Sequence, residues 1–175
     1  DIGLGIPAEP LFRSSIMVAA QYGIDCDESN LDGIICISHS IECLKGLKLI
    51  ESPFNMKIYY EPMMNSLKHI IKKSTYYSEE EKKEIMKGKI FKHYDDIVTS
   101  KNMGLNNAEE YYELLELRPK ITKIKIPTLF IFSEDDPFSN PEWIPKEEIQ
   151  KSKFVAFLTT KEGGHTSFAQ GWKNK

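Results

Sequence analysis

The stretch that decides the fold lies at residues 127–139 and reads PTLFIFSEDDPFS. Its first half is an uncharged run rich in aromatic and branched residues, which is typical of a buried strand. Pro127 can stand only at the start of a central strand, because it has no backbone N–H to donate. The second half is a polar turn that contains two adjacent carboxylates, Asp135 and Asp136. The stretch therefore predicts a central strand that ends in acidic side chains.

Two further apolar runs have the same character. Residues 33–37 read GIICI and residues 153–160 read KFVAFLTT, and we expect the first of these strands to be buried on both faces. Helical patterns occupy the intervals, at residues 14–23, where Gly23 would end the helix, and at 78–86, 107–118 and 145–149. Because strands separated by helices form parallel sheets, the predicted class is α/β, with a short sheet of about three strands flanked by helices.

The stretch from about residue 50 to residue 110 differs in texture from the rest. It is rich in Met, Tyr and Lys, and we predict that it is helical. It is too long for a single crossover, so we interpret it as a helical insertion or lid within one α/β domain spanning residues 1–175. Extra helices that merely cover the sheet are an equal alternative. Its methionines and tyrosines fit a hydrophobic core better than a pocket for an acyl chain, and we keep the pocket as the alternative interpretation.

Composition narrows the classes of function. The 175 residues carry 23 Lys and Arg against 26 Asp and Glu, which gives a net charge of −3. Only Arg13 and Arg118 are arginines. Because the chain has neither a positive net charge nor many arginines, we do not expect nucleic-acid binding. Three cysteines at unmatched spacings indicate structural thiols in a reducing, cytoplasmic compartment. No apolar run approaches the ~20 residues of a membrane span, and membrane attachment by other means stays open. His39, His69 and His93 share no metal-binding spacing.

Potential catalytic side chains follow two neighbouring strands. Asp135 and Asp136 come after the strand at residues 127–133, and His165 comes after the strand at residues 153–160, within GGHTSF. Ligand sites of parallel sheets gather at the carboxyl ends of the strands, so we expect an acid and the imidazole to meet there. A carboxylate that holds an imidazole in one tautomer is the orienting half of a nucleophilic triad.

The same segments resemble a known family. PTLFIFSEDDPFS, WIPKEEI at residues 143–149, FVAFLTT at residues 154–160 and GGHTSF at residues 163–168 are similar to the C-terminal portion of the YheT-like, or EMB8-like, esterases of the α/β-hydrolase superfamily. KHYDDIVTSKNMGLNNAEEYY at residues 92–112 resembles the segment before that portion. The resemblance implies a partial α/β-hydrolase fold and a carboxylic-ester hydrolase or lipase with a Ser, Asp and His triad, which needs no cofactor. It assigns the acid to Asp136, with Asp135 as the alternative, and the base to His165.

The nucleophile departs from the family pattern. Such a hydrolase carries Ser in a G-x-S-x-G turn, and this chain has no such motif. One alignment places the turn at residues 11–15, LFRSS, where Ser14 and Ser15 are the nearest hydroxyls. A second alignment places the turn at residues 1–5, DIGLG, with Gly3 at the position of the nucleophile. We favour helix caps for these two serines and keep a displaced nucleophile as the alternative. The competing function is a catalytically silent hydrolase-like domain that binds a lipid or a protein through the helical insertion.

The first strand would form an open edge of the sheet. Residues 33–37 correspond to a late strand of the family's sheet, and an apolar, uncharged edge favours pairing with another strand. We therefore expect an upstream segment, a partner chain or a second copy of this chain to complete the sheet. The expected small-molecule partner is an acyl ester or a lipid.

Overall fold

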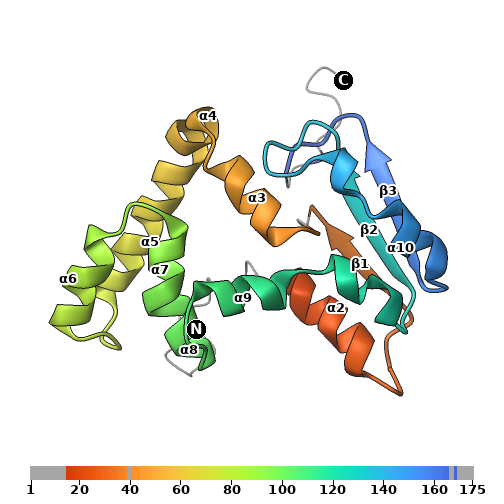
Figure 1. Cartoon of the computed structure of the whole chain (residues 1–175), viewed down its shortest axis with the longest axis horizontal. Coiled ribbons are helices and arrows are strands. Elements are labelled where there is room, and N and C mark those ends of the chain that lie inside the picture. The colour runs from red at the N-terminus through yellow and green to blue at the C-terminus, as the bar shows by residue number, and fades with distance from the viewer. Residues whose placement is uncertain (1–14, 39–40, 166–167, 169–175) are drawn as a thin grey trace, which may run out of the picture. The chain divides into compact units, whose positions relative to one another are not determined.

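The computed structural model describes residues 15–38, 41–165 and 168, with the side chains of residues 15–17 left aside (Figure 1). The described residues form two compact units. One unit contains residues 15–49 and residues from 115 onwards, and it holds the sheet. The other contains residues 50–114, and its regular elements are all helices. Each unit is described below by itself.

The sheet has three parallel strands in the order β1-β2-β3, as predicted. Their bounds are Ile34–Ile37 for β1, Thr128–Ser133 for β2 and Val155–Thr160 for β3. The register pairs Ile34 with Thr128 and Thr128 with Val155, so the three strands end at the same edge of the sheet. Between β2 and β3 the chain forms the short helix η4, Pro141–Trp143, and then α10, Lys146–Lys151.

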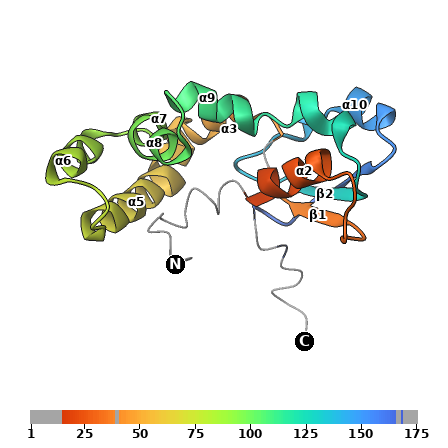
Figure 2. The ribbon, with the colours of Figure 1, turned by 90° about the horizontal axis from the view of Figure 1, so that it is seen from below.

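Helices cover one face of this sheet and bury its aromatic core. Helix α2, Ser15–Asp25, lies over β1 and β2 in Figure 2, and the 3-10 helix η3, Arg118–Lys123, packs on the same core. The rings of Phe130 and Phe132 each stack on Phe157, with centroids 4.8 and 5.4 Å apart. The core consists of Ala20, Cys36, Ile41, Leu117, Ile121, Ile124, Phe130, Phe132 and Val155.

The prediction that the first strand is buried on both faces is wrong. Cys36 is buried, but Ile35 and Ile37 point to the opposite face and are 67% and 47% exposed. β1 is an edge strand among the described residues, and no described helix packs over this second face. An unbroken apolar run cannot show which of its faces has a cover, because its pattern is the same in both cases.

Gly23 does not end the first helix, which continues to Asp25. A Cβ atom at this position would lie 3.3 Å from Cγ2 of Ile124, so the missing side chain allows α2 to approach η3 closely. The backbone carbonyl of Gly23 also accepts a 2.8 Å hydrogen bond from the N–H of Lys125. The glycine therefore serves packing here.

An ion-pair cluster fixes the loop that follows β1. Arg118 donates to Glu42 at 2.8 Å and to Glu148 of α10 at 2.9 Å. Burial alone would raise the pKa of Glu42, but hydrogen bonds from Lys45 and Arg118 lower it. The loop then leads into α3, Cys43–Ile50.

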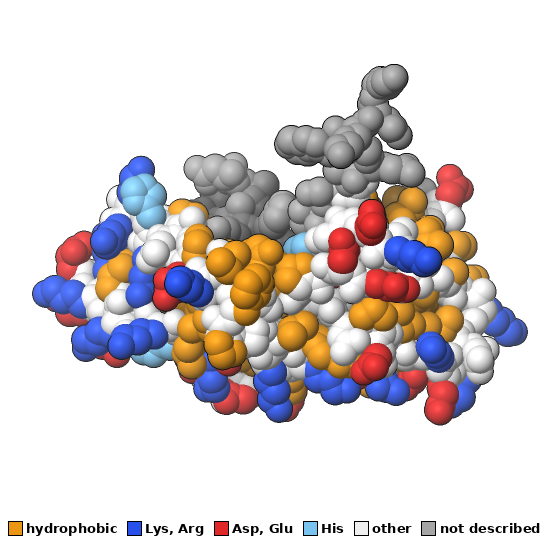
Figure 3. All heavy atoms as spheres, turned by 90° about the horizontal axis from the view of Figure 1, so that it is seen from above, with side chains coloured by type: hydrophobic (Ala, Val, Ile, Leu, Met, Phe, Trp, Pro, Cys, Tyr) orange, Lys and Arg blue, Asp and Glu red, His pale blue; other side chains and the backbone are white. Residues whose placement is uncertain are grey.

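The second unit is a bundle of short helices around its own core. Its elements are α4, Pro53–Asn55; the π-helix η1, Met56–Tyr60; α5, Glu61–Lys73; α6, Glu79–Lys87; α7, Phe91–Tyr94; the π-helix η2, Asp95–Thr99; α8, Ser100–Met103; and α9, Ala108–Leu115. Ser78 forms the predicted capping box with Glu81 at the start of α6. Acidic and basic side chains are interspersed over the face seen in Figure 3.

The methionines of this unit divide between core and surface. Tyr60 and Met64 are buried, and Met56 and Met86 pack against the same core, as the core interpretation predicts. Met63 and Met103 are exposed.

Asp95 of the helical unit has a structural role. It is buried and accepts hydrogen bonds from Thr99 at 2.6 Å and from Tyr112 at 2.8 Å. The role of residues 50–110 as an insertion or lid of a single domain stays a prediction.

Candidate functional site

The structure brings Asp136 and His165 together at the carboxyl edge of the sheet. Nδ1 of His165 lies 2.9 Å from Oδ2 and 3.2 Å from Oδ1 of Asp136. The Asp136 side chain is fully buried, whereas the imidazole is 39% exposed. An ionised carboxylate only accepts hydrogen bonds, so Nδ1 carries the shared proton and Nε2 is free to accept another.

The turn after β2 holds Asp136 in place. The N–H of Asp136 donates to the carbonyl of Ser133 at 3.3 Å, which closes a tight turn at the end of the strand. The N–H of Phe138 donates to Oδ1 of Asp136 at 2.8 Å. The carboxylate therefore has a fixed backbone donor in addition to the imidazole, as a buried charge requires.

Asp135 does not contact the imidazole and instead fixes the loop that carries it. Its Oδ1 accepts a 2.7 Å hydrogen bond from the N–H of Gly164, the residue before His165. The same oxygen accepts a short hydrogen bond from the Ser133 hydroxyl. The bonds from Ser133 and Gly164 lower the pKa of the Asp135 carboxyl. The two adjacent acids thus have separate roles: Asp136 holds the imidazole ring, and Asp135 holds the backbone of the loop that carries it.

Two glycines give the histidine loop its shape. Gly164 has a φ of +59°, in the left-handed region where other residues are strained. A Cβ atom on Gly163 would lie 2.6 Å from Cδ1 of Phe168 and 3.1 Å from the hydroxyl oxygen of Ser133. The N–H of Phe168 donates to the Gly163 carbonyl at 2.9 Å. The loop therefore folds back on itself around a residue without a side chain.

Phe138 packs against the imidazole edge to face. The two ring centroids lie 4.9 Å apart with an angle of 84° between the planes. This ring limits the directions in which the imidazole can turn, while the bond to Asp136 fixes its tautomer. Sequence reasoning gives no sign that Phe138 packs on the base. It also misses the role of Ser133, because a hydroxyl at a strand end has many common uses.

The predicted nucleophiles cannot be placed relative to His165. Ser14 is outside the described residues, and the side chain of Ser15 is not described, so neither the cap nor the nucleophile is tested. Among the described residues, the hydrogen bonds of the His165 side chain go to Asp136. Ser38 follows β1 at the same sheet edge, is buried and has a φ of +57°. Its hydroxyl has no hydrogen-bond partner among the described residues.

Other candidate residues have structural surroundings. Cys26, Cys36 and Cys43 form no disulfide within the described part of the chain, and burial raises the pKa of Cys36 to about 11. His69 is exposed, and His93 lies 3.1 Å from the carbonyl oxygen of Glu84. His39 lies outside the described residues. Within residues 15–38, 41–165 and 168, no three His, Cys, Asp or Glu side chains gather as metal ligands. None of the described helices has the length and apolarity to cross a bilayer.

Comparisons with known proteins point to one superfamily. No family model matches the chain. YheT of Escherichia coli, an esterase by name, is 36% identical over 78 residues, which cover 45% of this chain and 23% of YheT. Human phospholipase ABHD3 is 27% identical over 124 residues, or 70% of this chain and 30% of ABHD3. A monoacylglycerol lipase of Saccharomyces cerevisiae is 23% identical over 158 residues, or 86% of this chain and 34% of the lipase.

These matches agree with the fold and with the resemblance in the sequence. The chain spans about a quarter to a third of the length of these curated relatives. A three-stranded parallel sheet with helices is consistent with part of an α/β-hydrolase fold. The chain is a homologue of the YheT-like and ABHD3-like esterases and lipases of the α/β-hydrolase superfamily, matched over part of their length.

Proposed function

We propose that this chain supplies the acid and the base of a carboxylic-ester hydrolase. The observation that carries the proposal is the contact between Nδ1 of His165 and the buried carboxylate of Asp136. It is supported by the position of both residues at the carboxyl ends of neighbouring parallel strands, where hydrolase sites form. The names of the homologues, which are esterases, lipases and phospholipases, support the same reaction class.

The proposed roles follow from the two imidazole nitrogens. Nε2 of His165 takes the proton of a serine hydroxyl while that oxygen attacks the ester carbonyl. When the tetrahedral intermediate collapses, the carbon–oxygen bond to the alcohol breaks and Nε2 returns the proton to the leaving oxygen. A water molecule then repeats the cycle on the acyl-enzyme and releases the acid. Asp136 keeps Nδ1 protonated and stabilises the imidazolium in both steps.

The proposed nucleophile is a serine that the described site does not contain. Ser14 and Ser15 are candidates in this chain, and an upstream segment that supplies a G-x-S-x-G turn is the other source. Either source must present its hydroxyl to Nε2, which faces away from Asp136. The position of a covalent adduct on the chain distinguishes these sources directly.

A fluorophosphonate probe tests the proposal. It labels a serine only when a neighbouring base activates it. If Ser14 or Ser15 is the nucleophile, we expect labelling of the purified chain; if an upstream segment supplies it, we expect labelling only of a protein that includes that segment. In both cases the labelling should be lost in His165→Ala. His69→Ala is the matched control, because it removes an exposed histidine of the helical unit. Mass spectrometry then locates the adduct. Equal labelling of all three proteins, or labelling lost in the control as well, would contradict the assigned base.

The second candidate function is binding without catalysis. It is favoured by exposed apolar side chains in the helical unit. Phe54, Ile58 and Tyr76 are 68%, 48% and 50% exposed. A silent domain would bind lipid vesicles or a protein through these side chains. The fluorophosphonate probe would then label none of the variants. Substitution of Phe54 by Ser would then weaken binding without affecting the sheet unit.

We also propose that further strands or helices complete the sheet. Ile35, Ile37 and Leu158 are exposed on its second face, and β1 is an edge strand of the sheet formed by the described residues, a position that favours pairing with a further strand. The completing element is an upstream segment, a partner chain or a second copy. Size-exclusion chromatography with light scattering distinguishes the last case, because a stable monomer would exclude the second copy.

A further inference from the structure

A second candidate site lies at the opposite end of the strands from Asp136 and His165. It is an open pocket of about 590 Å³, within the roughly 300–1,000 Å³ of typical small-ligand sites. Lys125 precedes β2 and Phe154 precedes β3, so the pocket opens at the amino edge of the sheet. Because a six-residue strand is about 20 Å long, this pocket is separate from the acid and base pair.

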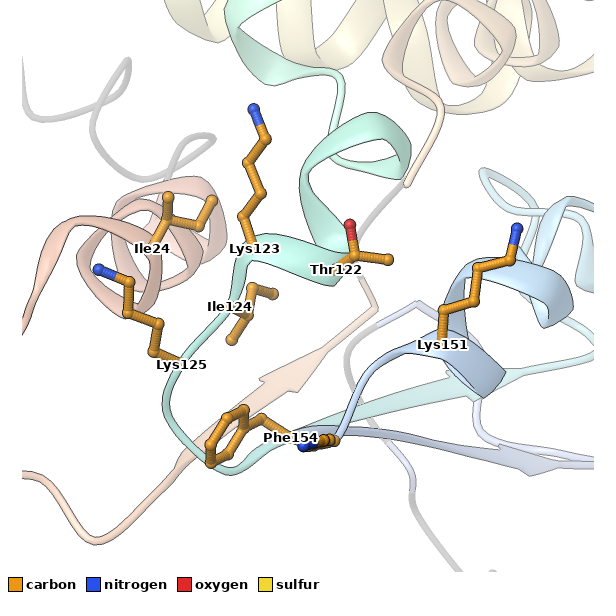
Figure 4. A pocket seen from close by; sticks show the side chains of 8 residues that line it. Ile24, Thr122, Lys123, Ile124, Lys125, Lys151 and Phe154 are labelled. Atoms are coloured by element: carbon orange, nitrogen blue, oxygen red, sulfur yellow. The ribbon is translucent and has the colours of Figure 1, made fainter.

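The floor of this pocket is apolar and well anchored. Ile24 of α2, the buried Ile124 and Phe154 supply the apolar part of the lining, which we call the floor, and Figure 4 shows these three side chains. The N–H of Lys125 donates to the Gly23 carbonyl at the end of α2, and the N–H of Thr128 donates to the Phe154 carbonyl at 2.7 Å. The floor thus joins three elements by backbone bonds, which gives it a defined shape without a ligand.

The rim of the pocket is cationic. Four lysines contribute to its lining, and no acidic residue does, although the whole chain has a net charge of −3. Lys125 forms an ion pair with Asp27 at 2.7 Å. The other three form no ion pair with a described carboxylate, and Figure 4 shows Lys123 and Lys151 on two different elements, η3 and α10. The lining consists of Ile24, Thr122, Lys123, Ile124, Lys125, Lys151, Lys153 and Phe154.

We infer that this pocket binds the anion of a medium-chain fatty acid. An apolar floor beneath ammonium groups complements a ligand with a hydrocarbon tail and one compact negative charge. Lysines are point charges without the planar fork of arginine, so they suit a single carboxylate and give no bidentate site for phosphate. The volume accommodates one chain. The inference does not depend on the reaction proposed for His165.

Isothermal titration calorimetry with decanoate tests the inference on the purified chain. We expect saturable binding to the wild type and binding about fivefold weaker in the double variant Lys123→Ala and Lys151→Ala, as suits two exposed ion pairs. The matched control is Lys83→Ala with Lys87→Ala in α6, which removes the same charge from the helical unit. Phe154→Ala removes part of the floor and should weaken binding while the lysine rim is intact.

Two further measurements separate binding in this pocket from nonspecific adsorption of a hydrocarbon chain and from binding beside His165. Neutral decanol should bind at least fivefold more weakly than decanoate, because it cannot pair with the lysines. His165→Ala should bind decanoate like the wild type. The inference is overturned by undetectable binding of decanoate, by equal weakening in the α6 control, by equal affinity for decanol, or by loss of binding in His165→Ala.

Discussion

Nδ1 of His165 lies 2.9 Å from a carboxylate oxygen of Asp136, and the carboxylate is fully buried while the imidazole is 39% exposed. This difference in exposure is what an orienting acid and a working base require. Burial shields the carboxylate and fixes its position, whereas exposure lets the second imidazole nitrogen reach a substrate. The helical unit plays no part in this contact, because both residues belong to the sheet unit.

Asp135 should position His165 by holding the backbone of the loop before it. Asp135→Ala removes the acceptor for the Gly164 N–H, and we expect a slower fluorophosphonate reaction, by roughly tenfold for about one lost hydrogen bond. Asp135→Asn keeps an acceptor oxygen at the same place and should recover much of the rate. The exposed neighbour Glu134 gives the control, Glu134→Ala. Equal rates for the Ala and Asn variants would show that the hydrogen bond is not the cause.

The same loop should loosen in acid. The pKa of Asp135 is lowered in the folded protein, so its bonds stabilise the loop above the ordinary Asp pKa of 3.8 and lose this effect as the pH falls through the lowered value. Amide hydrogen exchange at Gly164 should therefore show protection at pH 6 that is lost in strong acid. In Asp135→Asn, the protection should be independent of pH over the same range, and a pH dependence like that of the wild type would contradict the assignment.

Gly163→Ala should displace the histidine loop. The new methyl group would overlap the Phe168 ring and crowd the Ser133 hydroxyl, and the cost should be about 1–3 kcal/mol of the free energy of unfolding, as for other overpacked sites. Thermal unfolding measures the loss. Gly104→Ala is a useful comparison, because φ is +69° there and its Cβ would meet nothing within 4 Å, so only backbone strain contributes.

The sequence predicts the strands of this unit well because each is a short apolar run bounded by polar residues. It also places Asp136 and His165 at the correct edge, since parallel strands end together. It cannot decide between Asp135 and Asp136, because consecutive residues in a turn point in directions set by the hydrogen bond to Ser133. It overestimates the burial of β1 and misreads Gly23, since both depend on which elements pack nearby.

The three thiols should react at different rates. Cys36 is buried in the sheet core and its pKa is raised to about 11 by that burial, so it is almost entirely protonated at neutral pH. Cys26 and Cys43 are partly exposed. Iodoacetamide at pH 8, with the products read by mass spectrometry, should modify these two cysteines in the native protein. Modification of Cys36 should require unfolding, and its rapid modification in the native state would contradict the packing of β1.

Ester hydrolysis by the Asp136→Asn variant tests the central claim most directly. With p-nitrophenyl butyrate as substrate, we predict a kcat about 10³–10⁴-fold below that of the wild type, because the amide no longer holds the imidazole in the required tautomer. The Glu134→Gln variant should hydrolyse the ester at the wild-type rate. A wild-type kcat for Asp136→Asn would contradict the pairing of this acid with His165 in catalysis.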